Sequence, residues 1–230
     1  MLIGILQTGH APDELRAALG DYSDMFRQLL AGRGFEFTDF NVVEMEFPPD
    51  VHAADGWLLT GSRHGTYEHH AFIPPLEDFI RAAYAAHVPM VGICFGHQII
   101  AQALGGRVEK YSGGWSVGAT DYDIAGQQMT LNAWHQDQVT ALPPGATVLG
   151  SSGFCPYAAL AYDDDALTVQ AHPEFSAGMI DGLASTRGKG VVPAPLLQQA
   201  HANLNRPTDS AKLADMMTEF FLKPREASHG

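Results

Sequence analysis

Short apolar runs alternate with longer amphipathic segments through the first half of the chain, and this alternation limits the possible fold more than any other feature. Helical spacing of apolar residues covers residues 12–31, 72–87 and 95–104. The runs with the length and composition of buried strands lie at residues 2–6, 35–40, 55–60 and 89–93. Strands that alternate with helices favour a parallel sheet covered on both faces, so the sequence predicts an α/β fold.

The second half of the chain has a different pattern. Residues 107–150 form short β-rich segments broken by Gly and Pro, which favours antiparallel strands or hairpins. Two further strands are expected at residues 158–162 and 167–171, separated by an Asp-rich turn at residues 163–165. Closing helices are expected at residues 194–203 and 208–222, and the end, residues 224–230, is expected to fray. No linker interrupts the chain, so we expect one domain over residues 1–230.

Composition excludes several classes of protein. With 230 residues, 46% hydrophobic and 17% charged, the chain resembles an ordinary globular protein. A formal net charge of −13 argues against nucleic acid or an anionic membrane surface as the main partner, since both require a basic surface. No apolar run reaches the ~18 residues of a membrane span, and the N-terminus lacks signal-peptide features. The two cysteines, Cys94 and Cys155, make no disulfide framework, so we expect a reducing cytoplasm.

The pentapeptide Gly92-Ile93-Cys94-Phe95-Gly96, between a predicted strand and a predicted helix, has the pattern of a nucleophile elbow. The glycines two before and two after Cys94 remove side chains that would clash in the sharp turn. The thiol would then stand at a helix N-terminus, whose partial positive charge favours thiolate. The backbone N–H of Phe95 would be free to bind an oxyanion. A core cysteine in a Gly-rich turn is the alternative, and it is the expected role of Cys155.

His172 and Glu174 lie two residues apart at the end of a predicted strand. Alternate residues of an extended chain face the same side, so the carboxylate can bind one imidazole nitrogen and aim the other at a thiol. The pair alone is weak evidence, because a loop histidine beside a solvated glutamate is common. Together with the Cys94 elbow it predicts a Cys-His-Glu catalytic triad.

These motifs resemble those of the class I, or triad, glutamine amidotransferases. The resemblance covers about residues 1–185 and is strongest to the glutaminase domain of GMP synthase and its free-standing relatives, which include γ-glutamyl peptidases. The segments that carry it are Leu58-Leu59-Thr60-Gly61-Ser62, Gly92-Ile93-Cys94-Phe95-Gly96-His97-Gln98 and His172-Pro173-Glu174-Phe175. The fold is then expected to be a flavodoxin-like three-layer α/β/α sandwich with a mostly parallel central sheet and a small antiparallel addition.

The resemblance also implies roles for individual residues. Cys94 would be the nucleophile, His172 the general base and then acid, and Glu174 the residue that orients it. The amides of Gly61 and Phe95 would form the oxyanion hole, although Ser62-Arg63 replaces the Gly-Pro that often follows Gly61 in the family. The residues implied to bind the substrate are Gln98, His135, Gln136 and Asp137.

Other polar residues are expected to have no catalytic role. In the stretch that holds His64, Glu68, His69 and His70, adjacent His69 and His70 are not expected to give convergent ligands, so we predict no metal site. His97 is expected to be packed or hydrogen-bonded, and Trp115 to wall the pocket or pack in the core. No metal or organic cofactor is expected.

Three functions remain open on the sequence. The protein is expected to hydrolyse the γ-amide of glutamine, with ammonia passing to a synthetase on another chain, because no Gly-rich nucleotide loop is present. Alternatively, it is a stand-alone γ-glutamyl peptidase or hydrolase acting on a small γ-glutamyl compound. A catalytically silent binding or regulatory protein of the same fold is the third possibility, which the complete triad disfavours.

Overall fold

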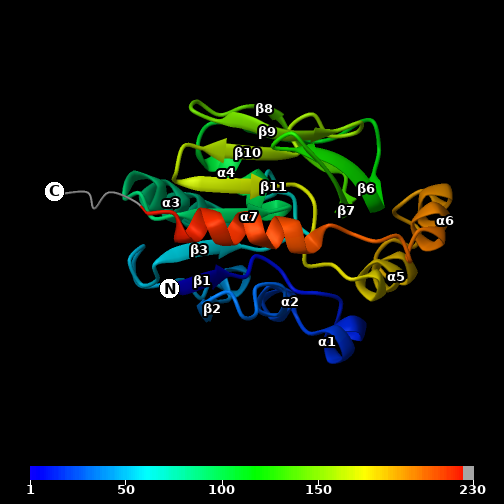
Figure 1. The fold of residues 1–230 in the computed structure, drawn as a ribbon, viewed down its shortest axis with the longest axis horizontal. Helices are drawn as coiled ribbons and strands as arrows, with labels where there is room; N and C mark the ends of the chain where they lie inside the picture. Colours follow the sequence, from blue (N-terminus) through cyan, green and yellow to red (C-terminus); the bar gives the residue numbers. More distant parts are fainter. Residues whose placement is uncertain (225–230) are drawn as a thin grey trace.

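A nine-stranded sheet runs through the computed structural model, which describes residues 1–224, in the order β2-β1-β3-β4-β11-β10-β9-β6-β7 (Figure 1). Its first five strands pair in parallel, as predicted from their alternation with helices. They are β2 (Glu36–Phe40), β1 (Leu2–Leu6), β3 (Gly56–Leu59), β4 (Met90–Ile93) and β11 (Ala166–Val169). The short strands β3, β4 and β11 are buried throughout, as expected for parallel strands covered on both faces.

The same sheet continues as an antiparallel half, so the predicted addition is joined to the parallel strands at β11. The strand β10 (Ala159–Tyr162) pairs antiparallel with β11, and β9 (Thr147–Ser152) and the hairpin of β6 (Ser116–Ile124) and β7 (Gln127–His135) follow. A separate ladder joins β5 (Arg107–Lys110) to β8 (Asp137–Ala141). The antiparallel strands expected within residues 107–150 are therefore confirmed.

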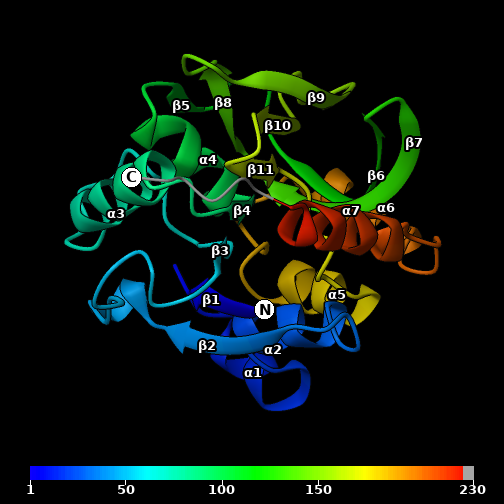
Figure 2. The ribbon, with the colours of Figure 1, turned by 60° about the vertical axis from the view of Figure 1, so that its left-hand side comes forward.

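Helices cover the parallel half on both faces (Figure 2). On one face, α3 (Ile73–Ala85) and α4 (Phe95–Ala103) pack residues such as Ile80 and Ile100 against the sheet. On the other, α2 (Tyr22–Leu29) and α7 (Ser210–Leu222) contribute Phe26 and Met217 to a second core. A third hydrophobic cluster joins α5 (Ala177–Ser185) to α1 (Asp13–Leu19) and α6 (Ala194–Ala202). A short 3-10 helix, η1 (Val42–Glu44), follows β2. This is the predicted three-layer α/β/α arrangement, and β2-β1-β3-β4 is the start of the flavodoxin-like strand order.

The prediction of one helix over residues 12–31 is wrong. The chain breaks at Gly20, whose φ of 78° no helix accommodates, and restarts at Asp21 as the N-cap of α2. Asp21 and Asp24 form a reciprocal capping box, which satisfies backbone donors that a continuous helix would have bonded internally. The break lets α1 turn away to contact α5.

Two further expectations concern the C-terminal end of the chain and membrane-spanning helices. From residue 225 onward, the expected frayed end lies outside the described residues. Among residues 1–224, no helix combines the length and apolar character needed to cross a bilayer.

Candidate active site

Cys94 stands at the sharp turn between β4 and α4, as the elbow pattern predicts. It is the N-cap of α4 and has a φ of 54° and a ψ of −102°, a region that a residue with a side chain rarely adopts. A Cβ added at Gly92 would lie 2.6 Å from the carbonyl carbon of Gly96, and one added at Gly96 would overlap the carbonyl oxygen of Leu59. Both glycines are therefore required by the close approach of backbone around Cys94.

His172 and Glu174 are held together just after β11. His172 Nδ1 lies 2.6 Å from Glu174 Oε1, and their side chains are 4% and 0% exposed. The backbone N–H of His172 donates to the carbonyl oxygen of Asn132 at 2.8 Å, and the Asn132 side chain donates to the carbonyl oxygen of Phe175 at 2.8 Å. The Phe175 ring stacks on the imidazole with a centroid separation of 3.9 Å. These contacts fix both the position and the plane of the imidazole.

The sheet topology brings these groups to one point. Because β3, β4 and β11 are adjacent and parallel, the residues after their carboxyl ends meet at one edge of the sheet. A Cβ on Gly61 would lie 2.9 Å from Cε1 of His172 and 3.8 Å from Cβ of Cys94. Gly61, Cys94 and His172 are therefore in mutual proximity.

The surroundings of His172 favour the imidazolium form. Burial acts to lower the pKa of His172, but the Glu174 carboxylate and the Cys94 thiolate oppose it by charge and hydrogen bonding and raise the pKa to about 10. His172 is therefore protonated at neutral pH, with Nδ1 facing Glu174.

Hydrogen bonds from Thr8 fix the predicted oxyanion loop. The carbonyl oxygen of Thr60 accepts from the Gly96 N–H at 3.1 Å and from Thr8 Oγ1 at 3.0 Å. Thr8 Oγ1 also lies 3.0 Å from the carbonyl oxygen of Gly61. Because the N–H and C=O of a trans peptide point in opposite directions, these bonds also fix the direction of the Gly61 N–H. Phe95 is the first residue of α4, where a backbone N–H has no acceptor within the helix.

A pocket of about 310 Å³ opens beside Cys94. It is lined by all four residues that the resemblance assigned to substrate binding, Gln98, His135, Gln136 and Asp137. Trp115 also lines it, in agreement with one of its two expected roles. Other residues that line the pocket, and that the sequence patterns do not indicate, include Tyr22, Tyr67, Lys110 and Arg187. They come from distant elements, and no local motif marks them.

Gln98 holds the wall of this pocket through its amide nitrogen. Its Nε2 donates to the carbonyl oxygen of Asp137 at 2.9 Å and to Oε1 of Gln170 at 3.0 Å. Both amide hydrogens are thereby engaged, so Gln98 positions the segment that begins β8.

His135 and Asp137 have perturbed electrostatics. Burial lowers the pKa of His135 to about 4, so its imidazole is neutral. Nδ1 lies 3.1 Å from the carbonyl oxygen of Asp137 and must donate to it, which leaves Nε2 as an acceptor. That Nε2 is buried with no hydrogen-bond partner among residues 1–224. Burial also raises the pKa of Asp137, although its carboxylate accepts from the Tyr67 hydroxyl at 3.1 Å.

The other residues considered above have structural roles. His97 is fully buried, its Nδ1 lies 2.8 Å from Thr168 Oγ1, and burial lowers its pKa to about 3. Cys155 is buried too, and burial raises the pKa of its thiol to about 12. It does not line the pocket, and it belongs to the same core cluster of buried residues as Cys94. Cys155 is therefore a core residue, as expected from the sequence.

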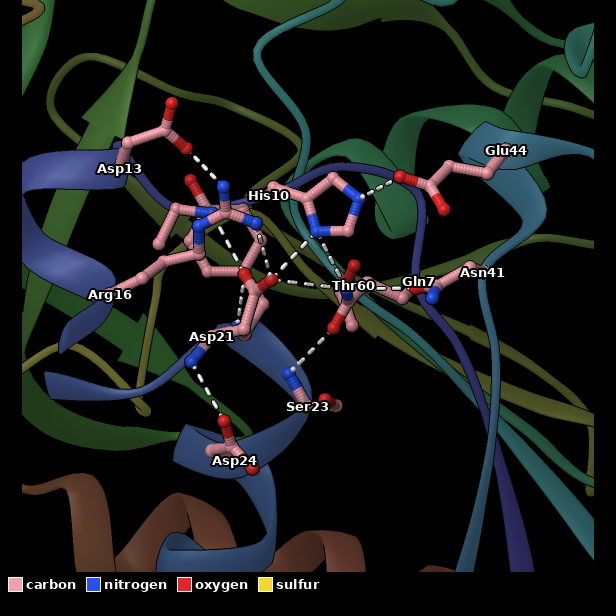
Figure 3. A network of polar contacts seen from close by, with 12 residues as sticks. Gln7, His10, Asp13, Arg16, Asp21, Ser23, Asp24, Asn41, Glu44 and Thr60 are labelled. Atoms are coloured by element: carbon pink, nitrogen blue, oxygen red, sulfur yellow. Dashed lines mark hydrogen bonds and ion pairs between the residues drawn. The ribbon is translucent and has the colours of Figure 1, made fainter.

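A second cavity, of about 710 Å³, adjoins the first and shares Arg63, His64 and Arg187 with it. Polar side chains brace its wall at the end of β1 and the start of α2 (Figure 3). His10 Nδ1 lies 2.6 Å from Asp21 Oδ2 and 2.9 Å from Gln7 Nε2. This network fixes the loop after β1, which also contains Thr8.

The family model for class-I glutamine amidotransferases matches residues 18–182. The chain belongs to this family. A glutamine amidotransferase-like protein of Schizosaccharomyces pombe is 29% identical over 96% of this chain and 98% of its own length. Gamma-glutamyl peptidase 4 of Arabidopsis thaliana is 27% identical over 89% of this chain and 88% of its own. GMP synthase of Cupriavidus pinatubonensis is 34% identical over 68% of this chain but only 32% of its own length.

Solved structures of the family share the fold. The crystal structure of a glutamine amidotransferase from Methylobacillus flagellatus superimposes with a TM-score of 0.76, at 21% identity, over 99% of this chain and 97% of its own. The similarity therefore extends beyond residue 182 to the closing helices.

Proposed function

We propose that this amidotransferase-family protein hydrolyses the γ-amide of glutamine or of a γ-glutamyl compound through a thioester on Cys94. The observation that carries the proposal is the placement of buried His172 between Cys94 and Glu174 at a nucleophile elbow. A merely structural cysteine would need neither the strained backbone nor an oriented base.

The reaction follows from these positions. The Cys94 thiolate attacks the γ-carbonyl carbon, and the N–H groups of Gly61 and Phe95 stabilise the oxyanion, each contributing about 3–4 kcal/mol. The His172 imidazolium gives its proton to the departing nitrogen, and ammonia or an amine leaves. Water then loses a proton to His172 and attacks the thioester, which releases glutamate and restores the thiol.

The pocket wall suits the amino-acid end of such a substrate, which carries an ammonium and a carboxylate. The free lone pair of His135 Nε2 is an acceptor for an N–H, and Asp137 supplies a carboxylate. The cationic side chains of Lys110 and Arg187 line the same pocket and match the substrate carboxylate. We therefore assign recognition to Gln136 and these groups, with Gln98 holding the segment in place.

Of the two forms of this function, we favour the stand-alone γ-glutamyl peptidase. The chain aligns with nearly the full length of a γ-glutamyl peptidase but with about a third of GMP synthase. The second cavity beside the pocket also leaves room for a leaving group larger than ammonia. An amidotransferase subunit would instead need a synthetase on a separate chain. In either form we expect a single domain in a reducing compartment, since the thiol must stay free.

The test is glutamate release by the purified protein from glutamine and from a panel of γ-glutamyl dipeptides. Faster turnover of dipeptides than of glutamine, with no second protein present, supports the peptidase. Slow glutaminase activity that rises with a co-purified synthetase supports the amidotransferase subunit. No release from any substrate by a folded protein would contradict both and favour a silent member of the family.

A further inference from the structure

The loop between β3 and α3 brings together two histidines and a glutamate. The ligand atoms of His64, Glu68 and His70 all lie within 4.8 Å of one another. His70 Nε2 is 2.8 Å and His64 Nδ1 is 3.7 Å from the same oxygen, Glu68 Oε2. The adjacent pair His69 and His70, from which no convergent ligands are expected, does not form this cluster, because His69 is exposed. The loop instead folds back so that His64 joins His70 and Glu68.

The spacing of these atoms fits a small transition-metal ion. Zinc binds imidazole nitrogen and carboxylate oxygen at about 2.0–2.2 Å, so two ligands of a tetrahedral site lie about 3.3–3.6 Å apart. The separations of 2.8 and 3.7 Å lie on either side of this range. The ligand nitrogens of His64 and His70 lie within 4.8 Å of each other, so side-chain rotations that bring them closer together would place all three ligands at bonding distance.

Packing and hydrogen bonds hold the loop in this shape. The His64 and His70 rings lie 4.0 Å apart, and each packs against the Phe72 ring at 5.9 Å. The backbone N–H of Glu68 donates to the carbonyl oxygen of Gly65 at 3.1 Å, and that of His70 to the carbonyl oxygen of Glu68 at 3.1 Å. The ligands are therefore positioned by the fold before any ion arrives, which lowers the entropy lost on binding.

We propose that His64, Glu68 and His70 bind Zn²⁺ or a similar divalent first-row transition ion. Two histidines, one carboxylate and an open fourth position for water form a donor set that such ions favour. His64 and Glu68 also line the pocket that contains Cys94, so the ion would form part of the pocket wall. The nearby Arg63 side chain is exposed and can turn into solvent, away from the ion. The proposal does not depend on the proposed hydrolase function.

The test measures Zn²⁺ binding to the full chain carrying Cys94→Ala, which removes the competing thiol. Equilibrium dialysis followed by metal analysis should find one tightly bound ion per chain. Loss of an outer-shell partner already weakens metal affinity about 10–100-fold. Removing a direct ligand with His70→Ala or Glu68→Gln should therefore weaken binding by more than about 100-fold. His69→Ala is the matched control, because it removes an exposed imidazole from the same loop, and it should bind as the parent does.

Cobalt gives a second readout that is independent of activity. The Co²⁺-loaded parent and His69→Ala should share the visible absorption bands of a four-coordinate site, and His70→Ala should lack them. Circular dichroism establishes that each variant is folded. Equal Zn²⁺ affinity in the parent, His70→Ala and Glu68→Gln would overturn the proposal. Failure of the parent to bind, or equal loss in His69→Ala, would also overturn it.

Discussion

Cys94 combines a strained backbone with a nearby buried ion pair. A non-glycine residue with φ of 54° and ψ of −102° costs about 1–3 kcal/mol, and the surrounding strand and helix must hold it there. The conformation places the thiol at the positive end of α4 and beside His172. The strain at this residue is therefore a condition of its proposed reactivity.

We predict unequal losses of activity on changing Cys94 and Glu174. Cys94→Ala should reduce glutamate release to background, because no thioester can form. Glu174→Gln should lower kcat/KM by about 10²–10⁴-fold, since thiol and base remain and only the orientation and charge of the imidazole suffer. Steady-state kinetics on the best γ-glutamyl substrate, with circular dichroism as the folding control, measures both. Wild-type turnover by folded Cys94→Ala would disprove the mechanism.

The raised pKa of His172 predicts a pH dependence of stability. A histidine whose pKa rises on folding stabilises the folded state fully below its unfolded pKa of about 6.5. That contribution is lost as the pH rises toward the folded value of about 10. The difference in free energy of unfolding between the wild type and His172→Gln should therefore decrease from pH 6.5 to 10. Urea unfolding at several pH values measures it, and a constant difference over that interval would contradict the raised pKa.

At the scale of elements, the candidate site lies where the sheet changes from parallel to antiparallel strand pairing. The strand β11 pairs in parallel with β4 on one side and antiparallel with β10 on the other. Cys94, the proposed nucleophile, follows β4, and His172, the proposed base, follows β11. The hairpin of β6 and β7 then reaches back to the base, because Asn132 of β7 pairs with His172. The antiparallel half of the sheet therefore helps to hold His172 in position.

The elbow depends on Gly96 as much as on Cys94. Gly96→Ala should destabilise the protein by about 1–3 kcal/mol and abolish activity, because its Cβ would overlap the carbonyl oxygen of Leu59. Gly178→Ala in α5 is the control, since the nearest atom would be 3.6 Å away. It should be neutral or stabilise by up to about 1 kcal/mol. Urea unfolding and kinetics of the two variants check this, and similar behaviour of both would disprove the steric argument.

Sequence patterns were informative where a structure depends on neighbouring residues. The elbow, the parallel strands and the His-x-Glu pair each follow from a few adjacent positions, so they could be predicted. The break at Gly20 could also have been found, from Gly20 followed by the Asp21 and Asp24 capping box. The convergence of His64 with His70 could not have been predicted from the sequence, because it depends on the path of an irregular loop.

At the scale of the whole molecule, α7 completes the core although it lies beyond the residues that the family model matches. Its Phe221 is 2% exposed, and its ring packs against that of Phe35 at 5.8 Å. A Cβ on Gly56 of β3 would lie 3.0 Å from the same ring. The helix therefore covers strands that lead directly to the site.

Adjacent residues of α7 provide a matched pair of variants. Phe221→Ala should lower the free energy of unfolding by about 3–5 kcal/mol, because it leaves a cavity under the sheet. Leu222→Ala, at a position 53% exposed, should change it by less than about 0.5 kcal/mol. Urea unfolding followed by circular dichroism measures both. Equal effects would show that α7 does not pack as described.

The position of β11 has a consequence for the newly made chain. The ribosome releases Cys94 well before β11 and His172, so the thiol exists for a time without its proposed base. In the proposed mechanism, Cys94 meets that base only when β11 joins β4. A change in the rate at which a thiol reagent labels Cys94 during refolding would therefore report when β11 joins β4, and the proposed catalytic site is completed only at that step.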